Sequence, residues 1–352
     1  MENFTQDGSS RLRALSIGLA LFAAQAAFSL AHAQTSYQLT PIGSFGGGTT
    51  QATAINSAGD VVGCSLAVIN GTTTLRAFVY SSGQMMDIGS LVNGGTACAN
   101  DINDTGAITG TSATPTGESR AFIYQNGTMT SLGNAGTSSE GNSINNAGLI
   151  AGAAFGFNGS YVGSFRYDAQ VTPPQVDIGN LGGGIITQAR SINVAGDIAG
   201  WAVNAGSRGT SFLYQNGVLT DLGLVLGFPS QAMAINDLGQ VVGSRNPDGG
   251  YLYDNGAVTT LPSLHGNGSS PTSLNNVRQI VGSDWTPTGN HAVVIAQGQI
   301  VDLNDAIVAS DPNKPFVTLE GAAGINDNGW IIADGLDIRT GVRGAYLLVP
   351  VP

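Results

Sequence analysis

The chain has 352 residues, of which 52 are glycine and 42% are hydrophobic, and its formal net charge at pH 7 is −11. A chain with this hydrophobic content can bury a core, so intrinsic disorder caused by a lack of hydrophobic residues is excluded. The acidic charge excludes nucleic acid and anionic membrane surfaces as favoured partners, because like charges repel. Abundant glycine beside only 10% charged residues is typical of many short strands joined by tight turns.

The first segment of the chain has the pattern of a secretory signal peptide. Two arginines precede an uncharged apolar run over residues 14–30, and Ala31-His32-Ala33 then forms a small-x-small cleavage site. A transmembrane helix is the competing interpretation, but the small-residue exit and the polar residues after it favour cleavage. We therefore predict a signal peptide over 1–33, cleaved after Ala33, and no membrane span in the mature chain. The protein is then secreted, periplasmic or attached to the cell surface.

An imperfect repeat fills the mature chain, 34–352, and predicts that it folds as a single domain. Its marker is Ile-Asn-x-x-Gly-x-(Val/Ile)-x-Gly, which occurs in five clear copies and two degenerate ones. The marker asparagines are Asn56, Asn103, Asn145, Asn193, Asn236, Asn275 and Asn326. The last lies 270 residues after the first, so the mean period is 45 residues.

The marker predicts a hairpin turn. Asparagine at the first turn position can bond the backbone ahead of it, and glycine at the fourth takes the left-handed conformation. Arg278 replaces that glycine in the sixth copy, so we expect a different or strained turn there. A second hairpin follows in most repeats, with Asn-Gly at 126–127, 216–217 and 255–256, which favours type I′ geometry. Each repeat is therefore predicted to form four short antiparallel strands.

Four strands in about 45 residues is the size of a propeller blade, so the sequence predicts an all-β, seven-bladed β-propeller with four-stranded antiparallel blades. The residue before the marker isoleucine is small in six copies, which suits an innermost strand, and Asp101 is the exception. The seventh repeat stops after its third strand at 345–348, whereas residues 37–43 have a fourth-strand pattern. We therefore expect the N-terminal strand to complete the last blade and close the ring.

The mature chain has two cysteines, Cys64 and Cys98, and an oxidising compartment would permit a disulfide between them. Cys64 lies five residues after Gly59 of the first marker, and Cys98 lies five residues before Asn103 of the second. The two thiols are therefore predicted to lie level with each other on adjacent blades. Register does not fix their lateral separation, so two buried free thiols are the alternative to the favoured disulfide.

The predicted third strands carry a motif that resembles that of the bacterial HAF repeat family, named for a His-Ala-Phe tripeptide. The matching positions read Arg76-Ala77-Phe78, Arg120-Ala121-Phe122 and His291-Ala292-Val293. The glycine-rich segments 43–48 and 179–184 are also similar to that family, and the resemblance covers nearly all of 37–349. It implies a propeller-like extracellular or surface repeat protein, and it implies no particular activity.

Signals for catalysis and for metal binding are weak. Eleven of the acidic residues recur at structural positions of the repeat, and no two of the others form a spaced acid–base pair. Only His265 and His291 remain after signal cleavage, and neither they nor the cysteines have the spacing of metal ligands. We therefore expect no catalytic residues, no metal and no cofactor.

Binding residues are expected on the face that carries the loops between second and third strands and between blades, because these segments are long and variable. The candidates there are Trp201, Arg245, His265, Asp284, Trp285 and His291. Tryptophan and arginine can anchor a ligand, but the two tryptophans could equally fill gaps between blades.

The sequence favours a monomeric, exported, non-catalytic binding or scaffold protein that recognises an extracellular protein or a glycan. The alternative is a carbohydrate-active hydrolase or lyase, because propellers also host such enzymes. Convergent carboxylates or histidines at the axial mouth would favour the enzyme. A tunnel lined by alanine, serine and backbone would favour the scaffold.

Overall fold

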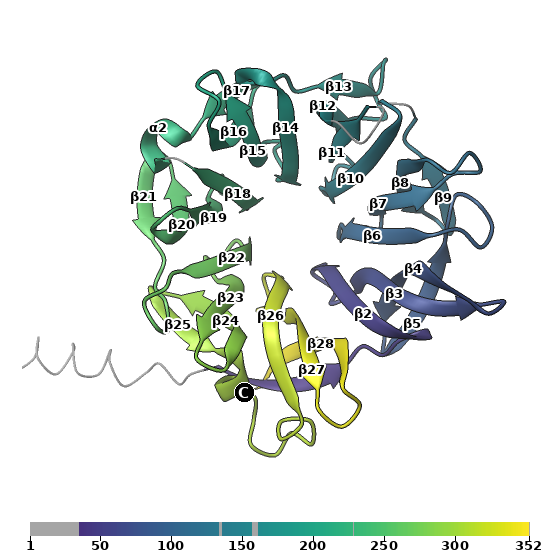
Figure 1. The fold of residues 1–352 in the computed structure, drawn as a ribbon, viewed down its shortest axis with the longest axis vertical. Helices are drawn as coiled ribbons and strands as arrows, with labels where there is room; N and C mark the ends of the chain where they lie inside the picture. Colours follow the sequence, from purple (N-terminus) through teal and green to yellow (C-terminus); the bar gives the residue numbers. More distant parts are fainter. Residues whose placement is uncertain (1–34, 134–135, 157–160, 228, 352) are drawn as a thin grey trace, which may run out of the picture.

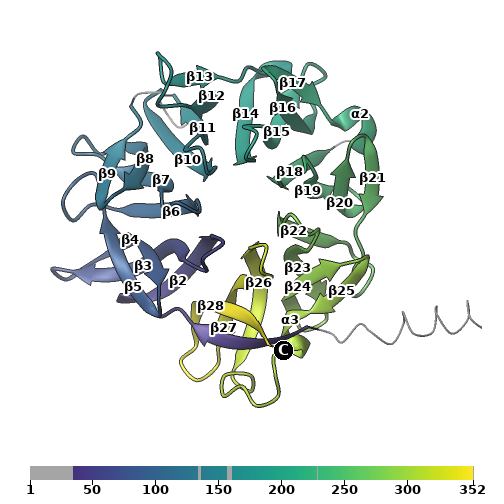
Figure 2. The ribbon, with the colours of Figure 1, turned by 180° about the vertical axis from the view of Figure 1, so that it is seen from behind.

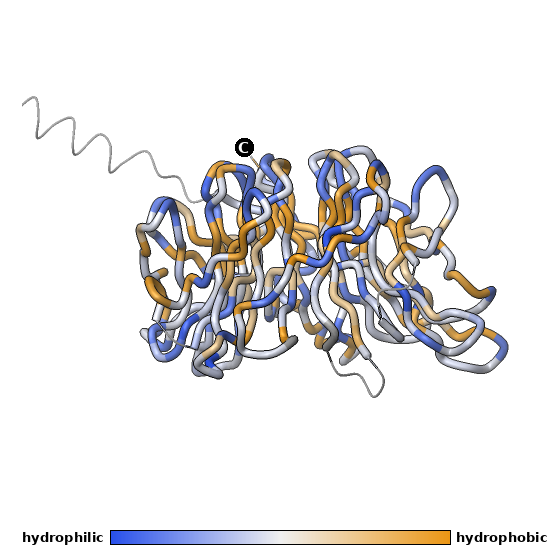
Figure 3. The backbone as a smooth tube through the Cα atoms, turned by 90° about the horizontal axis from the view of Figure 1, so that it is seen from above, coloured by the Kyte–Doolittle hydropathy of each residue, from blue (hydrophilic) through white to orange (hydrophobic). Residues whose placement is uncertain are grey.

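The computed structural model of the chain describes residues 35–133, 136–156, 161–227 and 229–351, so the predicted signal peptide, 1–33, lies outside the described residues. These residues form seven four-stranded antiparallel sheets, arranged as blades around one axis (Figure 1). The predicted all-β seven-bladed propeller is therefore confirmed. Seen edge-on, the molecule is a flat disc (Figure 3). Within the described part of the chain, no helix is long and apolar enough to cross a membrane.

In blades one to six the strands follow chain order from the axis outward (Figure 1). Blade one comprises β2 (Gly46–Ile55), β3 (Val61–Ile69), β4 (Thr72–Ser81) and β5 (Gln84–Gly89); blade two comprises β6 (Ala97–Ile102), β7 (Ile108–Ala113), β8 (Ser119–Gln125) and β9 (Thr128–Ser131). Blade three comprises β10 (Ser138–Ile144), β11 (Ile150–Phe155), β12 (Tyr161–Tyr167) and β13 (Gln175–Asp177); blade four comprises β14 (Gly182–Ile192), β15 (Ile198–Asn204), β16 (Gly209–Gln215) and β17 (Val218–Asp221). Blade five comprises β18 (Ser230–Ile235), β19 (Val241–Arg245), β20 (Gly249–Asp254) and β21 (Ala257–Thr260); blade six comprises β22 (Ser269–Leu274), β23 (Ile280–Thr286), β24 (Gly289–Ala296) and β25 (Gln299–Asp302). The short helices α2 (Gly223–Leu226) and α3 (Leu303–Ala306) lie in blade-to-blade connections.

Blade seven combines the two ends of the described chain, as the sequence predicted. It comprises β26 (Val317–Ile325), β27 (Ile331–Asp337), β28 (Val342–Val351) and the N-terminal strand β1 (Ser36–Pro41). β1 is the outermost strand of this blade, and it pairs antiparallel with β28 (Figure 2). Tyr37 and Leu39 of β1 are buried, at 1% and 3% exposure. The ring is therefore closed by packing as well as by backbone pairing.

The hydrophobic core is divided into layers between neighbouring blades. Between blades one and two, for example, Ile88 belongs to the same buried cluster as Ile108 and Phe122. Between blades seven and one, Phe78 shares a cluster with Ile332. Successive side chains of a strand point to opposite faces, so each blade contributes to the layers on both of its sides. Each blade therefore depends on its neighbours to bury its apolar residues.

The turns have the geometry that the sequence predicted. The six marker glycines at the fourth turn position have φ between +75° and +86°. Of the two alternatives expected at Arg278, a different or a strained turn, the structure shows the strained one, because the backbone N–H of Arg278 still donates to Asn275 O as in the other copies. Arg278 adopts φ +65°, which costs a residue with a side chain about 1–2 kcal/mol, so the expected strain is present. The Asn126-Gly127 turn has φ +52° and +78°, as type I′ requires.

The marker asparagines also form a closed ring of hydrogen bonds between blades, which the sequence did not predict. Each side-chain amide donates to the backbone carbonyl of the marker asparagine in the next blade, at 2.9–3.3 Å, and Asn326 returns to Asn56. Each side-chain oxygen meanwhile accepts backbone N–H groups of its own turn, as Asn145 does from Ala147 and Leu149. One residue type therefore shapes the turns and joins the blades.

Candidate functional site

The axial mouth on the face of the marker turns, called here the turn face, is a cavity of about 220 Å³. Its acidic residues are Asp104, Asp237 and Asp327, each directly after a marker asparagine. Each carboxylate accepts a backbone N–H of the preceding blade, for example Asp104 from Ser57 at 2.9 Å. Burial opposes ionisation of Asp104, but hydrogen bonds from Ser57 and Asn146 outweigh it, so the pKa of Asp104 is lowered. These carboxylates join neighbouring blades around the rim.

Deeper along the axis, a second cavity of about 170 Å³ is lined by residues of all seven innermost strands. Several of its polar side chains bond the next blade: Thr53 donates to Ala99 O at 2.9 Å, Asn100 to Gly141 O at 2.9 Å and Asn142 to Ala189 O at 2.7 Å. The lining also contains Asp101 and Arg190, so it is more polar than the alanine-and-serine tunnel considered above. Its polar groups nevertheless connect strands and do not converge on one point.

Asp101, the exception at the small-residue position, has a connecting role of the same kind. Its carboxylate accepts hydrogen bonds from Ser143 Oγ and Ile144 N of blade three, both at 2.8 Å, and from Ile102 N at 2.9 Å. Burial raises its pKa to about 6 in spite of these bonds. Ser143 acts similarly towards blade four, where its hydroxyl accepts the N–H of Ile192 at 3.2 Å. Asp101 therefore extends a blade-to-blade pattern.

Five of the six predicted ligand-binding residues lie in strands, so the expectation that loops carry them is wrong for those five. Only His265 lies in a connection, between β21 and β22, where it is exposed. Asp284, on β23, is 2% exposed and holds that connection by accepting Leu264 N at 2.8 Å and Ser263 Oγ at 3.2 Å. His291 lies opposite Asp284 on β24. Asp284 therefore has a positioning role within blade six.

The other candidates lie apart. Trp201 is on β15 of blade four, Arg245 at the end of β19 of blade five, and Trp285 on β23 of blade six. Arg245 is held by bonds to Leu226 O at 3.1 Å and Thr260 Oγ1 at 2.9 Å. Trp285 is 51% exposed and stays available to a partner. The six candidates thus do not form one site.

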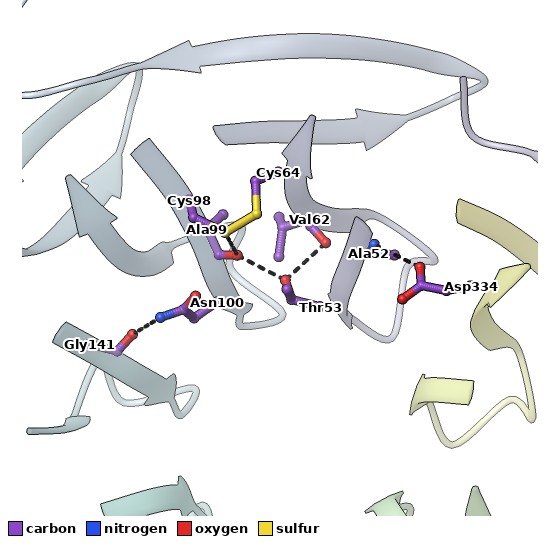
Figure 4. Close-up of a disulfide and its surroundings, with 9 residues drawn as sticks. All are labelled: Ala52, Thr53, Val62, Cys64, Cys98, Ala99, Asn100, Gly141 and Asp334. Carbon is purple, nitrogen blue, oxygen red and sulfur yellow. Dashed lines mark hydrogen bonds between the residues drawn. A yellow bond between two sulfur atoms is a disulfide. The ribbon is translucent and has the colours of Figure 1, made fainter. Parts of the chain in front are cut away.

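One strand position, eight residues after the marker asparagine, directs its side chain towards the next blade. In blade one it is Cys64, which forms a disulfide with Cys98 of blade two, with a Cα–Cα distance of 4.9 Å (Figure 4). In blade seven it is Asp334, whose Oδ1 accepts the N–H of Ala52 at 3.4 Å (Figure 4). Trp201 occupies this position in blade four and is half-buried. Its place favours the gap-filling interpretation of that tryptophan.

A side-chain pair on the third and fourth strands, called here the latch, occurs in blades one, four and six and involves two of the three motif positions, whereas Arg120 of blade two pairs with Glu118 instead. In blade one Arg76 donates two hydrogen bonds to the carboxylate of Asp87, at 2.9 and 3.1 Å. In blade four Thr210 donates to Asp221, and in blade six His291 Nδ1 lies 2.6 Å from Asp302 Oδ2. The latch closes the space between the two outer strands on the face of the blade-to-blade connections, called here the loop face. His291, predicted as a ligand-binding residue, is therefore part of a latch.

Blade seven has no latch, because the two equivalent positions are Gly344 and Pro41; blades three and five also have a glycine at the third-strand position, Gly163 and Gly249. A cavity of about 370 Å³ lies in this part of the loop face, called here the seam groove. One wall is the segment that runs from the end of β1 into β2, and the other runs from the end of β27 into β28, so residues from 41–50 and 337–346 line it. The groove lies where the two ends of the described chain share one blade.

Tyr346 projects its hydroxyl into the seam groove for a steric reason. In other blades the equivalent aromatic ring packs over a glycine of the second strand; a methyl group added at Gly200 would lie 2.8 Å from the ring of Phe212. In blade seven that position is Ala333, which lies opposite Tyr346. The ring of Tyr346 lies beside Gly344, its hydroxyl 3.7 Å from where a Cβ there would be. The missing latch therefore leaves room for this side chain.

The hydroxyl of Tyr346 has no hydrogen-bond partner among the residues that the structure describes, although the residue is only 4% exposed. Burial and the nearby carboxylate of Asp337 raise its pKa, so the hydroxyl stays protonated at neutral pH. The equivalent Tyr251 of blade five does have a partner, Ser211 Oγ at 2.8 Å. The ring of Tyr346 is buried, but its hydroxyl opens onto the groove, where it can bond a ligand. Pro41 and Ala333, which depart from the repeat pattern, are the signal that could have identified it.

The ions beside the seam groove are paired. Asp337 forms an ion pair with Arg339 at 2.6 Å, and hydrogen bonds from that guanidinium lower the pKa of Asp337. Arg343 forms an ion pair with Glu320 at 2.7 Å. Val342 lines the groove and is 40% exposed. Within the described ranges, no group of three or more histidine, cysteine or acidic residues is placed to hold a metal ion.

No protein-family model and no curated protein matches this chain. Among solved structures, it is similar to the β-propeller domain of the Trilobed protease from Pyrococcus furiosus, with a TM-score of 0.55 and 8% identity over 85% of this chain and 95% of that one. That domain has an open velcro topology, whereas β1 closes the ring here. The chain is also similar to a prolyl endopeptidase, with a TM-score of 0.51 and 9% identity over 90% of this chain and 51% of that one. At these identities the similarity shows the fold alone.

Proposed function

We propose that the mature chain, 34–352, is a monomeric, exported, non-catalytic binding module of the HAF repeat family, which recognises an extracellular protein or a glycan through its loop face. The observation that carries this proposal is the seam groove, a preformed cavity into which Tyr346 directs an unpartnered hydroxyl. A cavity of about 370 Å³ with a few polar groups has the properties of a small-molecule or side-chain binding site. The signal-peptide pattern supports export, and the latch gives the family motif a physical role.

The chemistry of the groove favours binding over hydrolysis. The common glycosidase mechanism needs two carboxyl groups, one of them with a raised pKa. Asp337 is the one carboxylate among the groove-lining residues, and the pKa of Asp337 is lowered by Arg339. At the axial mouth, where the enzyme alternative would need convergent acids, Asp104, Asp237 and Asp327 are engaged with neighbouring backbone.

A latch transplant tests the proposal. Pro41→Asp combined with Gly344→Arg reproduces the Arg76–Asp87 pair in blade seven and fills the groove. The nearest atoms to a Cβ at Gly344 are at 3.7 Å or more, so the position accepts a side chain. The mature protein is screened against glycan and secreted-protein libraries, with chromogenic glycosides as the test for hydrolysis. We expect saturable binding by the wild type, its loss in the transplant at an unchanged thermal midpoint, and no hydrolysis.

Trp285→Ala is the matched control, because it alters an exposed loop-face residue outside the groove. It should bind like the wild type. If Trp285→Ala loses binding while the transplant retains it, the tryptophan hypothesis replaces this one. Hydrolysis that disappears in the transplant would show an enzyme.

A further inference from the structure

We propose that the seam groove binds an uncharged sugar of a neutral glycan, an inference that rests on the proposed binding function. The charge balance of the groove is the first argument. Asp337 and Arg343 are its charged lining residues, and each is paired with an opposite charge, Arg339 and Glu320. Each charge is offset by its partner, so the groove has no net charge that would favour an anionic or a cationic ligand over a neutral one.

The hydrogen-bonding groups of the groove suit sugar hydroxyls. Tyr346 offers a hydroxyl that can both donate and accept, and it has no competing partner within the described chain. The hydroxyl of Thr340 also lines the groove, where it accepts the N–H of Val342 at 3.2 Å. A sugar hydroxyl is likewise a donor and an acceptor, so it can pair with Tyr346 in either direction. A hydroxyl paired in this way favours ligands that carry a matching group.

The wall formed by the connection from β1 to β2 has room for a flat ring. Gly43, Gly46 and Gly48 line it with positive φ, and a Cβ at any of them would meet no atom within 4 Å. At these three glycines the wall is therefore bare backbone, and Ser44 and Thr50 contribute the side chains beside it. Exposed backbone and hydroxyls on one side, with Val342 on the other, match the polar edges and apolar face of a sugar.

An extended peptide is the competing ligand, and the strand edge disfavours it. Peptides that add to a sheet gain affinity from a ladder of main-chain hydrogen bonds. The last bond between the N-terminal segment and β28 runs from Ile42 N to Ala345 O at 3.0 Å, so the uncovered edge of β28 is only 342–344. Backbone groups alternate in direction along a strand, so this edge offers about one outward N–H and C=O pair. That is too short for a ladder.

The test is calorimetric titration of the mature protein with three ligand sets: neutral oligosaccharides, uronate or sulfated oligosaccharides, and extended peptides. The first set should bind, with an affinity that is unchanged between low and high salt because no ligand charge is involved. The latch transplant, Pro41→Asp with Gly344→Arg, should abolish that binding. Tyr346→Phe should weaken it about 3- to 10-fold, the loss of one hydrogen bond, and leave the thermal midpoint unchanged.

Tyr251→Phe is the matched control, because it removes the same atom from the equivalent position of blade five, where the hydroxyl bonds Ser211. It should lower the thermal midpoint and leave the affinity unchanged. Preferential binding of charged sugars or of peptides, lost in the transplant, would overturn the neutral-sugar inference and leave the binding function intact. Sugar binding that survives the transplant would overturn both.

Discussion

Replacing Asn145 by alanine removes one link from the ring of marker asparagines. Three hydrogen bonds are lost: the one that its amide donates to Asn193 O at 2.9 Å, and the two that its side-chain oxygen accepts from Ala147 N and Leu149 N, both at 3.0 Å. Asn193 O keeps a second donor, Gly196 N, so no carbonyl is left bare. At about 0.5–1.5 kcal/mol for each bond, the free energy of unfolding should fall by about 2–4 kcal/mol.

For a domain of about 300 residues this corresponds to a decrease of about 3–6 °C in the thermal midpoint. Denaturant titration followed by tryptophan fluorescence measures the free energy, and an unchanged m-value shows that the folded state is otherwise intact. Asn146→Ala is the matched control, because Asn146 is adjacent but exposed and bonds only the rim residue Asp104. It should cost less than about 1 kcal/mol. If Asn145→Ala costs no more than Asn146→Ala, the ring does not stabilise the fold.

Three further predictions concern the junctions of blade one and the closure of the ring. The double substitution Cys64→Ser with Cys98→Ser opens a 34-residue loop and should lower the free energy of unfolding by about 3–4 kcal/mol. Titration of two free thiols in the denatured, unreduced wild type would disprove the bridge. Deletion of 35–43 removes β1 with its buried side chains and should cost more than about 5 kcal/mol, so a thermal midpoint equal to that of the parent would contradict closure by this strand. Burial raises the pKa of Asp334 to about 7, so this carboxyl stays protonated in the folded state at pH values where the unfolded chain has already released the proton. The free energy of unfolding therefore falls as the pH rises from about 4 to 7. Asp334→Asn should therefore match the wild type at pH 4 and exceed its stability at pH 8, and parallel pH profiles would show that Asp334 does not titrate in this way.

The fold was predictable because its signals are local. A glycine four positions into a turn needs the left-handed conformation whatever surrounds it, and an Asn-Gly dipeptide specifies a type I′ hairpin by itself. Counting residues from these turns also placed Cys64 and Cys98 level on adjacent blades, where they lie 4.9 Å apart between Cα atoms. The same reasoning left two alternatives at Arg278, and the bonds of the turn decide for the strained one by holding its backbone in the glycine conformation.

The candidate site was not predictable by residue type. Asp284 and His291 were chosen as chemically capable side chains, but each is occupied by partners that only the fold brings near. Trp201 fills the position that Cys64 and Asp334 use to reach the next blade. The sequence gives no signal at Tyr346 by itself, because it stands where a core phenylalanine stands in other repeats. Its access to the groove depends on three neighbouring residues, Pro41, Ala333 and Gly344. These residues are distant in the sequence and surround Tyr346 only in the folded protein.

By itself, the sequence determined the number of blades, the order of strands in each blade and the way the ring closes, because period and turn chemistry act within about 45 residues. Only the tertiary structure decided which side chains meet between blades. Ala52 and Asp334, for example, are joined across 282 residues, and the bond from Asn326 to Asn56 spans 270. Contacts at such separations depend on the curvature of the whole ring. The seam groove is of this kind, because it exists where the two ends of the chain share one blade.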